Sequence, residues 1–177
     1  MRLKMRIVRT VLVTIALVAL GIWMGGMIAL GPIAAPIVFR MIPAPMSGDA
    51  MTTIFRRFDR VAVGCVAVVL MVEMALAMLP GRKISRVDVA RVALAALGAV
   101  LAIYVGLAVS PHIEELHRAG AIRGLGLLGT ELQRTHVVAE RLGQSELALA
   151  VAVMALHAFA LGDGNLRPSS AGGQKPD

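Results

Sequence analysis

Residues 61–79 read VAVGCVAVVLMVEMALAML, an apolar run that is interrupted by one carboxylate, Glu73. A helix needs roughly 20 predominantly apolar residues to cross a hydrocarbon core about 30 Å thick. The run is therefore long enough to span a membrane, and it would carry Glu73 to membrane depth. A carboxylate at that depth is expensive, so we expect Glu73 to have a partner on another helix.

Three further apolar windows surround this run, at about residues 10–30, 88–109 and 145–162. The chain is 58% hydrophobic and only 16% charged, whereas about a quarter of the residues of a soluble domain are charged. We therefore predict an all-α fold, an integral membrane four-helix bundle, with residues 1–162 as one four-span transmembrane domain. Residues 163–177 are polar and rich in Gly, Ser and Pro, and we expect a disordered C-terminal tail.

The net charge of +7 comes largely from basic residues that flank the apolar windows. Such residues act as topology signals and contacts for anionic lipids. With only 3% aromatic residues, the chain offers no base-stacking platform, so we expect a lipid bilayer and no nucleic acid as partner. We predict a multi-pass protein of the bacterial inner (plasma) membrane with both termini in the cytoplasm. A homo-oligomer or a complex with another membrane protein would both fit.

Turn signals divide the rest of the chain. Gly31-Pro32 predicts a bend or the end of the first span. Ser110-Pro111 has the form of an N-cap followed by proline, which predicts a short helix before a long last helix. Thr130–Gln133 reads as a capping box, and we expect it to open that last helix, which would run to about Leu161.

Small residues recur at helical spacing in two spans. Gly21, Gly25 and Ala29 share one face of the first span, where a small-xxx-small pattern lets another helix approach closely. Packing within the monomer is the simpler interpretation, and a dedicated dimer face is the alternative. A second such face lies in the third span and consists of Ala95, Ala99, Ala102 and Gly106.

Glu73 has two candidate partners at a similar depth, His157 in the fourth span and Thr14 in the first. We predict an intramembrane polar cluster of Thr14, Glu73 and His157, in which Glu73 and His157 could share a proton. A structural polar clasp, a transport or proton-linked role, and no contact at all remain open as interpretations.

No nucleophile–base pair, paired carboxylates or phosphate-binding loop occurs in the sequence, and the four histidines lack ligand spacing. We therefore expect no enzymatic activity, no catalytic residue, no cofactor and no metal site. Met71, Met74 and Met78 form a stripe that points away from Glu73, and we interpret them as apolar filler. The leading hypothesis is a structural or interaction protein. The alternative is a small transporter or a copper- or metal-resistance component that uses Glu73 and His157.

Several short motifs occur together between about residues 10 and 160: Gly21 and Gly25, then PIVF (Pro36 to Phe39), Phe55 and Phe58, PHIEEL (Pro111 to Leu116) with Gly120 after it, and His136. In these motifs the chain resembles the bacterial four-helix membrane proteins related to transmembrane protein 205, a domain named for its unknown function. The resemblance implies a four-span bundle with a periplasmic connection before the last helix. It implies no established activity.

Overall fold

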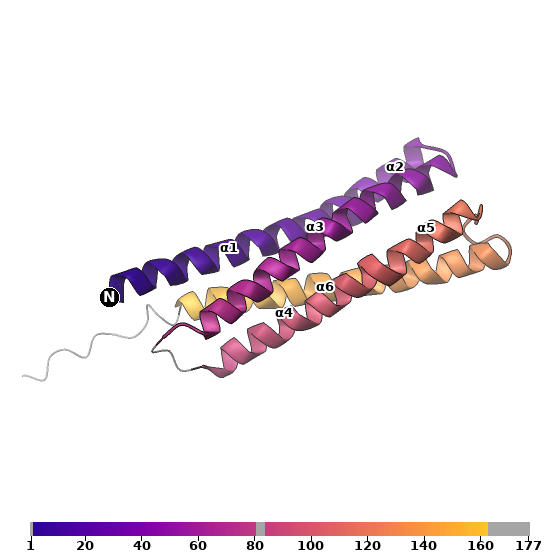
Figure 1. The fold of residues 1–177 in the computed structure, drawn as a ribbon. Helices are drawn as coiled ribbons and strands as arrows, with labels where there is room; N and C mark the ends of the chain where they lie inside the picture. The colour runs from indigo at the N-terminus through magenta and orange to yellow at the C-terminus, as the bar shows by residue number, and fades with distance from the viewer. Residues whose placement is uncertain (1, 81–83, 163–177) are drawn as a thin grey trace, which may run out of the picture.

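The computed structural model describes residues 2–80 and 84–162, and in this part of the chain four helical rods run alternately up and down (Figure 1). Each rod is long and apolar enough to cross a membrane, which confirms the predicted all-α four-helix bundle. The predicted tail, 163–177, lies outside the described residues. In chain order the elements are α1 (Arg2–Ile28), η1 (Ala29–Ala34), α2 (Ala35–Met41), α3 (Met46–Ala77), α4 (Arg86–Tyr104), η2 (Val105–Val109), α5 (Ser110–Arg118) and α6 (Gly126–Gly162).

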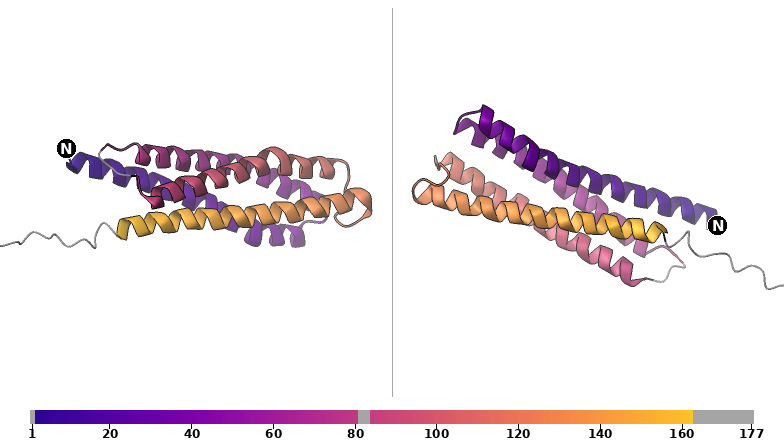
Figure 2. Two further views of the ribbon diagram at one scale, coloured as in Figure 1. Left: turned by 90° about the horizontal axis from the view of Figure 1, so that it is seen from below. Right: turned by 180° about the vertical axis from the view of Figure 1, so that it is seen from behind.

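The four rods form a ring in which α1 packs against α3 and α6, and α4 packs against the same two helices. The start of α1 and the end of α6 lie at one end of the bundle, which we call the terminal end (Figure 2). The end of α3 and the start of α4 lie at this end too, whereas α2, α5 and the start of α6 lie at the opposite end. Rods that follow each other in the chain are thus antiparallel neighbours.

Two of the predicted helix breaks are instead continuous turns of wider helix. Pro32 lies inside the π-helical segment η1, and the rod continues through it to Met41. Pro111 follows the second π-helical segment, η2, which joins α4 directly to the short helix α5. Proline removes a backbone donor and crowds the carbonyl four residues before it, and a π turn is one way for a helix to absorb that defect without ending.

The last helix begins at Gly126, one turn before the predicted capping box. The Thr130 hydroxyl donates to the Gly126 carbonyl within the helix, so Thr130 is not the N-cap. The first turn folds back on the preceding loop, where the Gly124 amide donates to the Gly129 carbonyl. A side chain at position 129 would collide with the Ile122 carbonyl oxygen, so this close return requires glycine.

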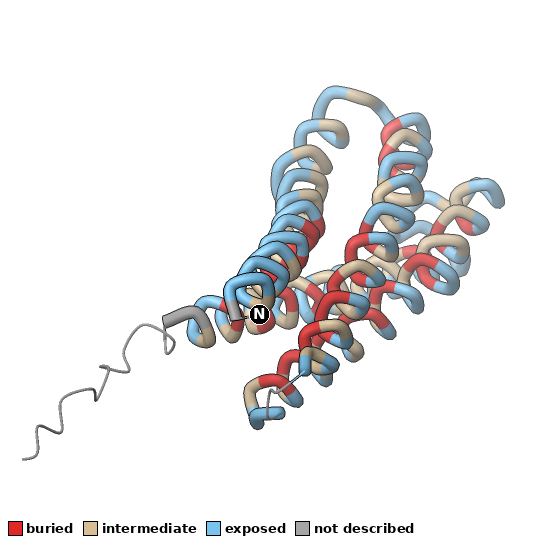
Figure 3. Tube along the Cα trace, turned by 60° about the vertical axis from the view of Figure 1, so that its left-hand side comes forward, coloured by how far each residue is buried: buried red, intermediate tan, exposed pale blue. Residues whose placement is uncertain are grey.

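The core of the bundle is built mostly from small and β-branched side chains. Figure 3 marks the buried positions along the four rods. The predicted small face of the third span is confirmed, since Ala95, Ala99, Ala102 and Gly106 are all buried. Gly98 lies beside them, and a Cβ at that position would be 3.0 Å from Trp23 Cη2. Small residues on α4 therefore leave the space that the Trp23 ring of α1 occupies.

The small face predicted for the first span packs against none of the described residues. Gly21, Gly25 and Ala29 are exposed, and a Cβ added at Gly21 or Gly25 would have no atom within 4 Å. The close approach falls on Gly26 instead, where a Cβ would collide with the Phe58 ring of α3. The prediction of packing within the monomer is therefore wrong for these three residues. The face of α1 that packs against α3 contains Gly26, one position after Gly25.

Candidate functional site

Glu73 lies near the end of α3 and faces the interior of the bundle. Its side chain is 1% exposed, and the α3 residues one turn on either side of it, Val69 and Leu76, are equally buried. The neighbouring methionines Met71 and Met74 are exposed, as their position on the opposite face of the helix requires. A carboxylate in such surroundings needs partners that replace water.

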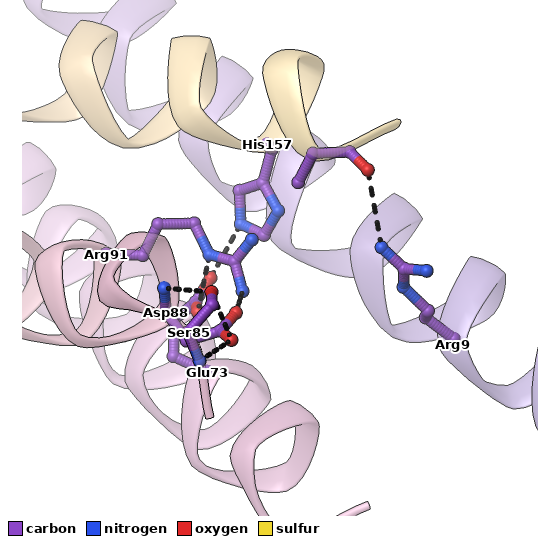
Figure 4. Close-up of polar contacts among 7 residues, drawn as sticks. Arg9, Glu73, Ser85, Asp88, Arg91 and His157 are labelled. Carbon is purple, nitrogen blue, oxygen red and sulfur yellow. Dashed lines mark hydrogen bonds and ion pairs between the residues drawn. The ribbon is translucent and has the colours of Figure 1, made fainter. Parts of the chain in front are cut away.

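His157 of α6 supplies the first partner, and the two side chains point toward each other across the helix interface (Figure 4). His157 Nε2 lies 2.6 Å from Glu73 Oε1, and the histidine is 1% exposed. The structure thus brings together two of the three residues predicted for the intramembrane cluster. Glu73 and His157 are 84 positions apart in the sequence.

Arg91 of α4 is the second partner, and the sequence analysis did not single it out. Its Nε donates to Glu73 Oε2 at 3.0 Å and its Nη2 donates to Asp88 Oδ1 at 2.8 Å. Arg91 and Asp88 are as well buried as Glu73, at 2% and 3% exposed. We refer to Glu73, Asp88, Arg91 and His157 as the charge cluster.

The start of α4 positions Asp88 within this cluster. Ser85 is the N-cap of α4, and its hydroxyl accepts from the Asp88 amide at 3.2 Å while Asp88 Oδ2 accepts from the Ser85 amide at 2.9 Å. This reciprocal capping box uses one oxygen of Asp88 and leaves the other for Arg91. The sequence motif Ser85-Arg86-Val87-Asp88, three residues before an arginine, was the signal available for finding it.

Thr14 does not join the cluster. It is exposed on α1, and its hydroxyl donates to the Thr10 carbonyl one turn earlier on the same helix. Thr14 has a depth similar to that of Glu73 but lies on another face, because Val13 and Ala16 are the residues that α1 buries there. A different contact joins α1 to α6 at this end, from Arg9 Nη2 to the Ala160 carbonyl at 3.5 Å (Figure 4).

The charges of the cluster nearly cancel. Two carboxylates face the Arg91 guanidinium and the His157 imidazole, so the formal sum is zero when His157 is protonated and −1 when it is neutral. Each carboxylate contacts at least one cationic or ionisable partner. Breaking a buried ion pair by removing one partner is strongly destabilising, because it leaves an uncompensated charge. The arrangement can therefore hold α3, α4 and α6 in one register.

A second pair of acids, the buried Glu146 and the half-buried Asp59, lies nearer the opposite end. Glu146 of α6 is 5% exposed and interacts with the Trp23 indole, while Asp59 of α3 interacts with Ser110. Neither carboxylate forms an ion pair with a described residue, and Glu146 Oε1 and Asp59 Oδ2 are buried without a hydrogen bond of ordinary geometry. Glu146 lies inside the predicted span 145–162 and was missed, although an acid in an apolar window is the same signal that identified Glu73.

The remaining predicted positions lie away from the charge cluster. Pro36 and Phe39 are exposed on α2, and Pro111 is in the first turn of α5. His136 lies on the first half of α6, and its ring makes an edge-on contact with His117 of α5 at a centroid distance of 6.0 Å. Among the described residues, no three His, Cys, Asp or Glu side chains are grouped so that they could hold a metal ion.

Comparison with known proteins gives one family match. Residues 18–122 match the family described as Domain of unknown function (DUF4149). The matched segment contains Glu73, Asp88 and Arg91, whereas His136 and His157 lie beyond it. No curated protein and no solved structure matches the chain. The match does not connect the chain to transmembrane protein 205 specifically, but it covers more than half of the 177 residues, so the chain belongs to the DUF4149 family, a domain of unknown function.

Proposed function

We propose that this protein is a structural and interaction component of the membrane, without enzymatic activity of its own. The observation that carries the proposal is the closure of the charge cluster. Glu73 contacts both Arg91 and His157, and Arg91 also contacts Asp88, so each member of the cluster has an ion-pair contact with another member. A cluster that is buried and internally paired suits a clasp that fixes helix packing better than it suits a site that exchanges a ligand.

The proposal includes a location and an orientation. We place the protein in the bacterial inner membrane with both termini in the cytoplasm. The support is the basic segment that precedes the first span, with Arg2, Lys4, Arg6 and Arg9 and no acid.

The proposal also includes a partner, either a second copy or another membrane protein. The exposed small face of α1 and the exposed methionines of α3 are available for this contact. A kinship with transmembrane protein 205 rests on the motif positions alone.

A second candidate function is a small transporter or metal-resistance component that uses Glu73 and His157. The observation that favours it is the second pair of acids, the half-buried Asp59 and the buried Glu146, which no described cation neutralises as an ion pair. Against it stands the stretch of α6 between Glu146 and His157, about 16 Å long at about 1.5 Å per residue. The residues that this stretch buries, Ala150 and Val153, are apolar.

Thermal unfolding of the detergent-purified protein separates the two functions. We expect Glu73→Gln and Glu73→Leu both to lower the unfolding midpoint, because each leaves the buried Arg91 short of a carboxylate. Gln144→Leu, an exposed position on α6, is the control and should change the midpoint little. Unchanged or raised stability in both Glu73 variants would contradict the clasp. Ion flux in proteoliposomes that depends on Glu73 would then favour the second candidate.

A further inference from the structure

The opposite end of the bundle has a hollow whose lining is strongly basic. It has a volume of about 380 Å³ and lies between α3 and α5. Four arginines and one histidine line it together with two carboxylates and two threonines: Arg56, Arg57, Arg60, Arg118, His117, Asp49, Glu114, Thr52 and Thr53. Cationic side chains of this kind, arginine above all, suit phosphate and carboxylate ligands.

A second hollow, of about 370 Å³, adjoins the first, because Arg56 and Arg60 line both. This groove runs between α3 on one side and the end of α4 with η2 on the other. Apart from Asp59, the rest of its wall is apolar or glycine: Val63, Ile103, Gly106 and Leu107. Gly106 has no side chain to fill the groove, and Leu107 and Ile103 are 76% and 45% exposed. The groove is therefore accessible from the side of the bundle that faces the surrounding lipid.

Some arginines of the two hollows have an ion-pair partner and others do not. Arg56 Nε lies 3.2 Å from Glu114 Oε2 and its Nη1 donates to the Gly106 carbonyl at 3.0 Å. Arg118 also pairs with Glu114, so that one carboxylate serves two arginines. Arg57 and Arg60 are exposed and make no hydrogen bond or ion pair with a described residue. They lie three positions apart on α3 and so project from neighbouring places on one helix face.

The position of these groups along α3 matches the two parts of a lipid. Arg60 immediately precedes the apolar run 61–79, and Val63 lies within that run. The arginines are thus at the boundary where a span leaves the hydrocarbon, and the apolar wall continues into it. A ligand that fits both hollows would carry an anionic group at one end and a hydrocarbon chain at the other.

We propose that the two hollows together bind one anionic phospholipid. Its phosphate lies against Arg57 and Arg60, and an acyl chain lies along Val63, Ile103 and Leu107. The site is independent of the charge cluster, which lies at the terminal end, about 20 Å away along α3 at about 1.5 Å per residue.

The test is lipid binding by the full chain in detergent, measured by native mass spectrometry and by the thermal unfolding midpoint. Phosphatidylglycerol is the probe, with phosphatidylcholine and inorganic phosphate as comparisons. We expect one phosphatidylglycerol to be retained per chain and to raise the midpoint, while the two comparison ligands do not. Arg57→Gln combined with Arg60→Gln should weaken phosphatidylglycerol binding about tenfold or more, because charge-assisted hydrogen bonds are lost.

Two controls distinguish this site from ordinary attraction between arginines and headgroups. Arg40→Gln with Arg134→Gln removes two exposed arginines from the same end but none from the hollows, and binding should change less than twofold. Gly106→Leu should abolish binding with every arginine intact. Gly106→Ala, whose methyl would make an ordinary contact at 3.5 Å from Asp59 Cβ, should keep it. Equal binding of phosphatidylcholine or phosphate, or an equal loss in the Arg40/Arg134 control, would overturn the proposal.

Discussion

At the scale of single residues, Arg91 is the centre of the charge cluster. It contacts both buried carboxylates, Glu73 through Nε and Asp88 through Nη2. A lysine would replace it poorly, because its donors all lie on one nitrogen, whereas the planar guanidinium reaches the two carboxylates with separate nitrogens. The stability of this end of the bundle should therefore depend more on Arg91 than on either carboxylate.

Replacement of Arg91 by leucine tests this dependence. The change removes the guanidinium that Glu73 and Asp88 both contact, and we expect a loss of about 3–5 kcal/mol in the free energy of unfolding. Adding Glu73→Leu to the same chain removes one of these two carboxylates, so the double variant should be less destabilised than the sum of the two single variants. Thr14→Val, on the exposed face of α1, should stay within about 0.5 kcal/mol of the wild type. Strict additivity of Arg91 and Glu73 would mean that they do not interact.

The sequence identified part of this cluster and missed part for a physical reason. Glu73 and His157 are polar residues inside apolar windows, where any polar group needs an explanation. Arg91 and Asp88 lie next to a short basic loop, and charged residues at such places are normally solvated topology signals. They are buried because the first turns of α4 pack against α3 and α6, and a sequence pattern does not reveal that packing. Thr14 was wrongly included because similar depth along a helix does not determine which face a side chain occupies.

At the scale of helices, Gly25 and Gly26 show how narrowly a packing face is defined. They are consecutive on α1, yet a side chain at Gly25 would enter open space and one at Gly26 would collide with the Phe58 ring. The α1–α3 contact therefore depends on one glycine, and the conspicuous Gly21/Gly25/Ala29 pattern lies outside that contact. Sequence spacing revealed the pattern but could not establish which stripe of the helix is buried.

Alanine substitutions at these two neighbours should give opposite results. Gly26→Ala forces the Phe58 ring to move, and we expect a loss of about 1–3 kcal/mol, typical of overpacking. Gly25→Ala adds a methyl group in open space and should be neutral or slightly stabilising, because alanine favours helix more than glycine does. Thermal unfolding of both variants is the measurement. Replacing Phe58 with leucine should restore part of the stability lost in Gly26→Ala, and a failure to do so would place the strain elsewhere.

Most helices could be predicted from the sequence, and their ends could not. Three apolar windows lie within an observed rod, and the fourth, 61–79, runs two residues past the end of α3. The windows and the rods agree because a span must satisfy its own backbone hydrogen bonds in lipid. The rods are longer than the windows, and Pro32 and Pro111 do not stop them. Whether a proline ends a helix or is absorbed by a π turn depends on the neighbouring helix, which a sequence pattern does not specify.

At the scale of the whole molecule, four antiparallel rods place residue 4 and the turn after α5 at opposite ends. We expect Lys4→Cys to be shielded from a membrane-impermeant maleimide in intact cells and Leu125→Cys to react with it. Both positions are exposed. Cys65→Ala, which removes the buried native thiol, is the background for both. A reversed pattern would contradict the proposed orientation, and reaction of both from one side would contradict the four-span arrangement.

The double use of Arg91 has a consequence for biogenesis. As the chain leaves the ribosome, Glu73 enters the insertion machinery on α3, and Arg91 follows 18 residues later at the start of the next helix. His157 is synthesised only 84 residues after Glu73. The acid can therefore be neutralised as soon as α3 and α4 form a hairpin, long before α6 exists. The second and third rods would accordingly enter the bilayer as one unit in which Glu73 is already paired with Arg91, and the last helix would dock onto it afterwards.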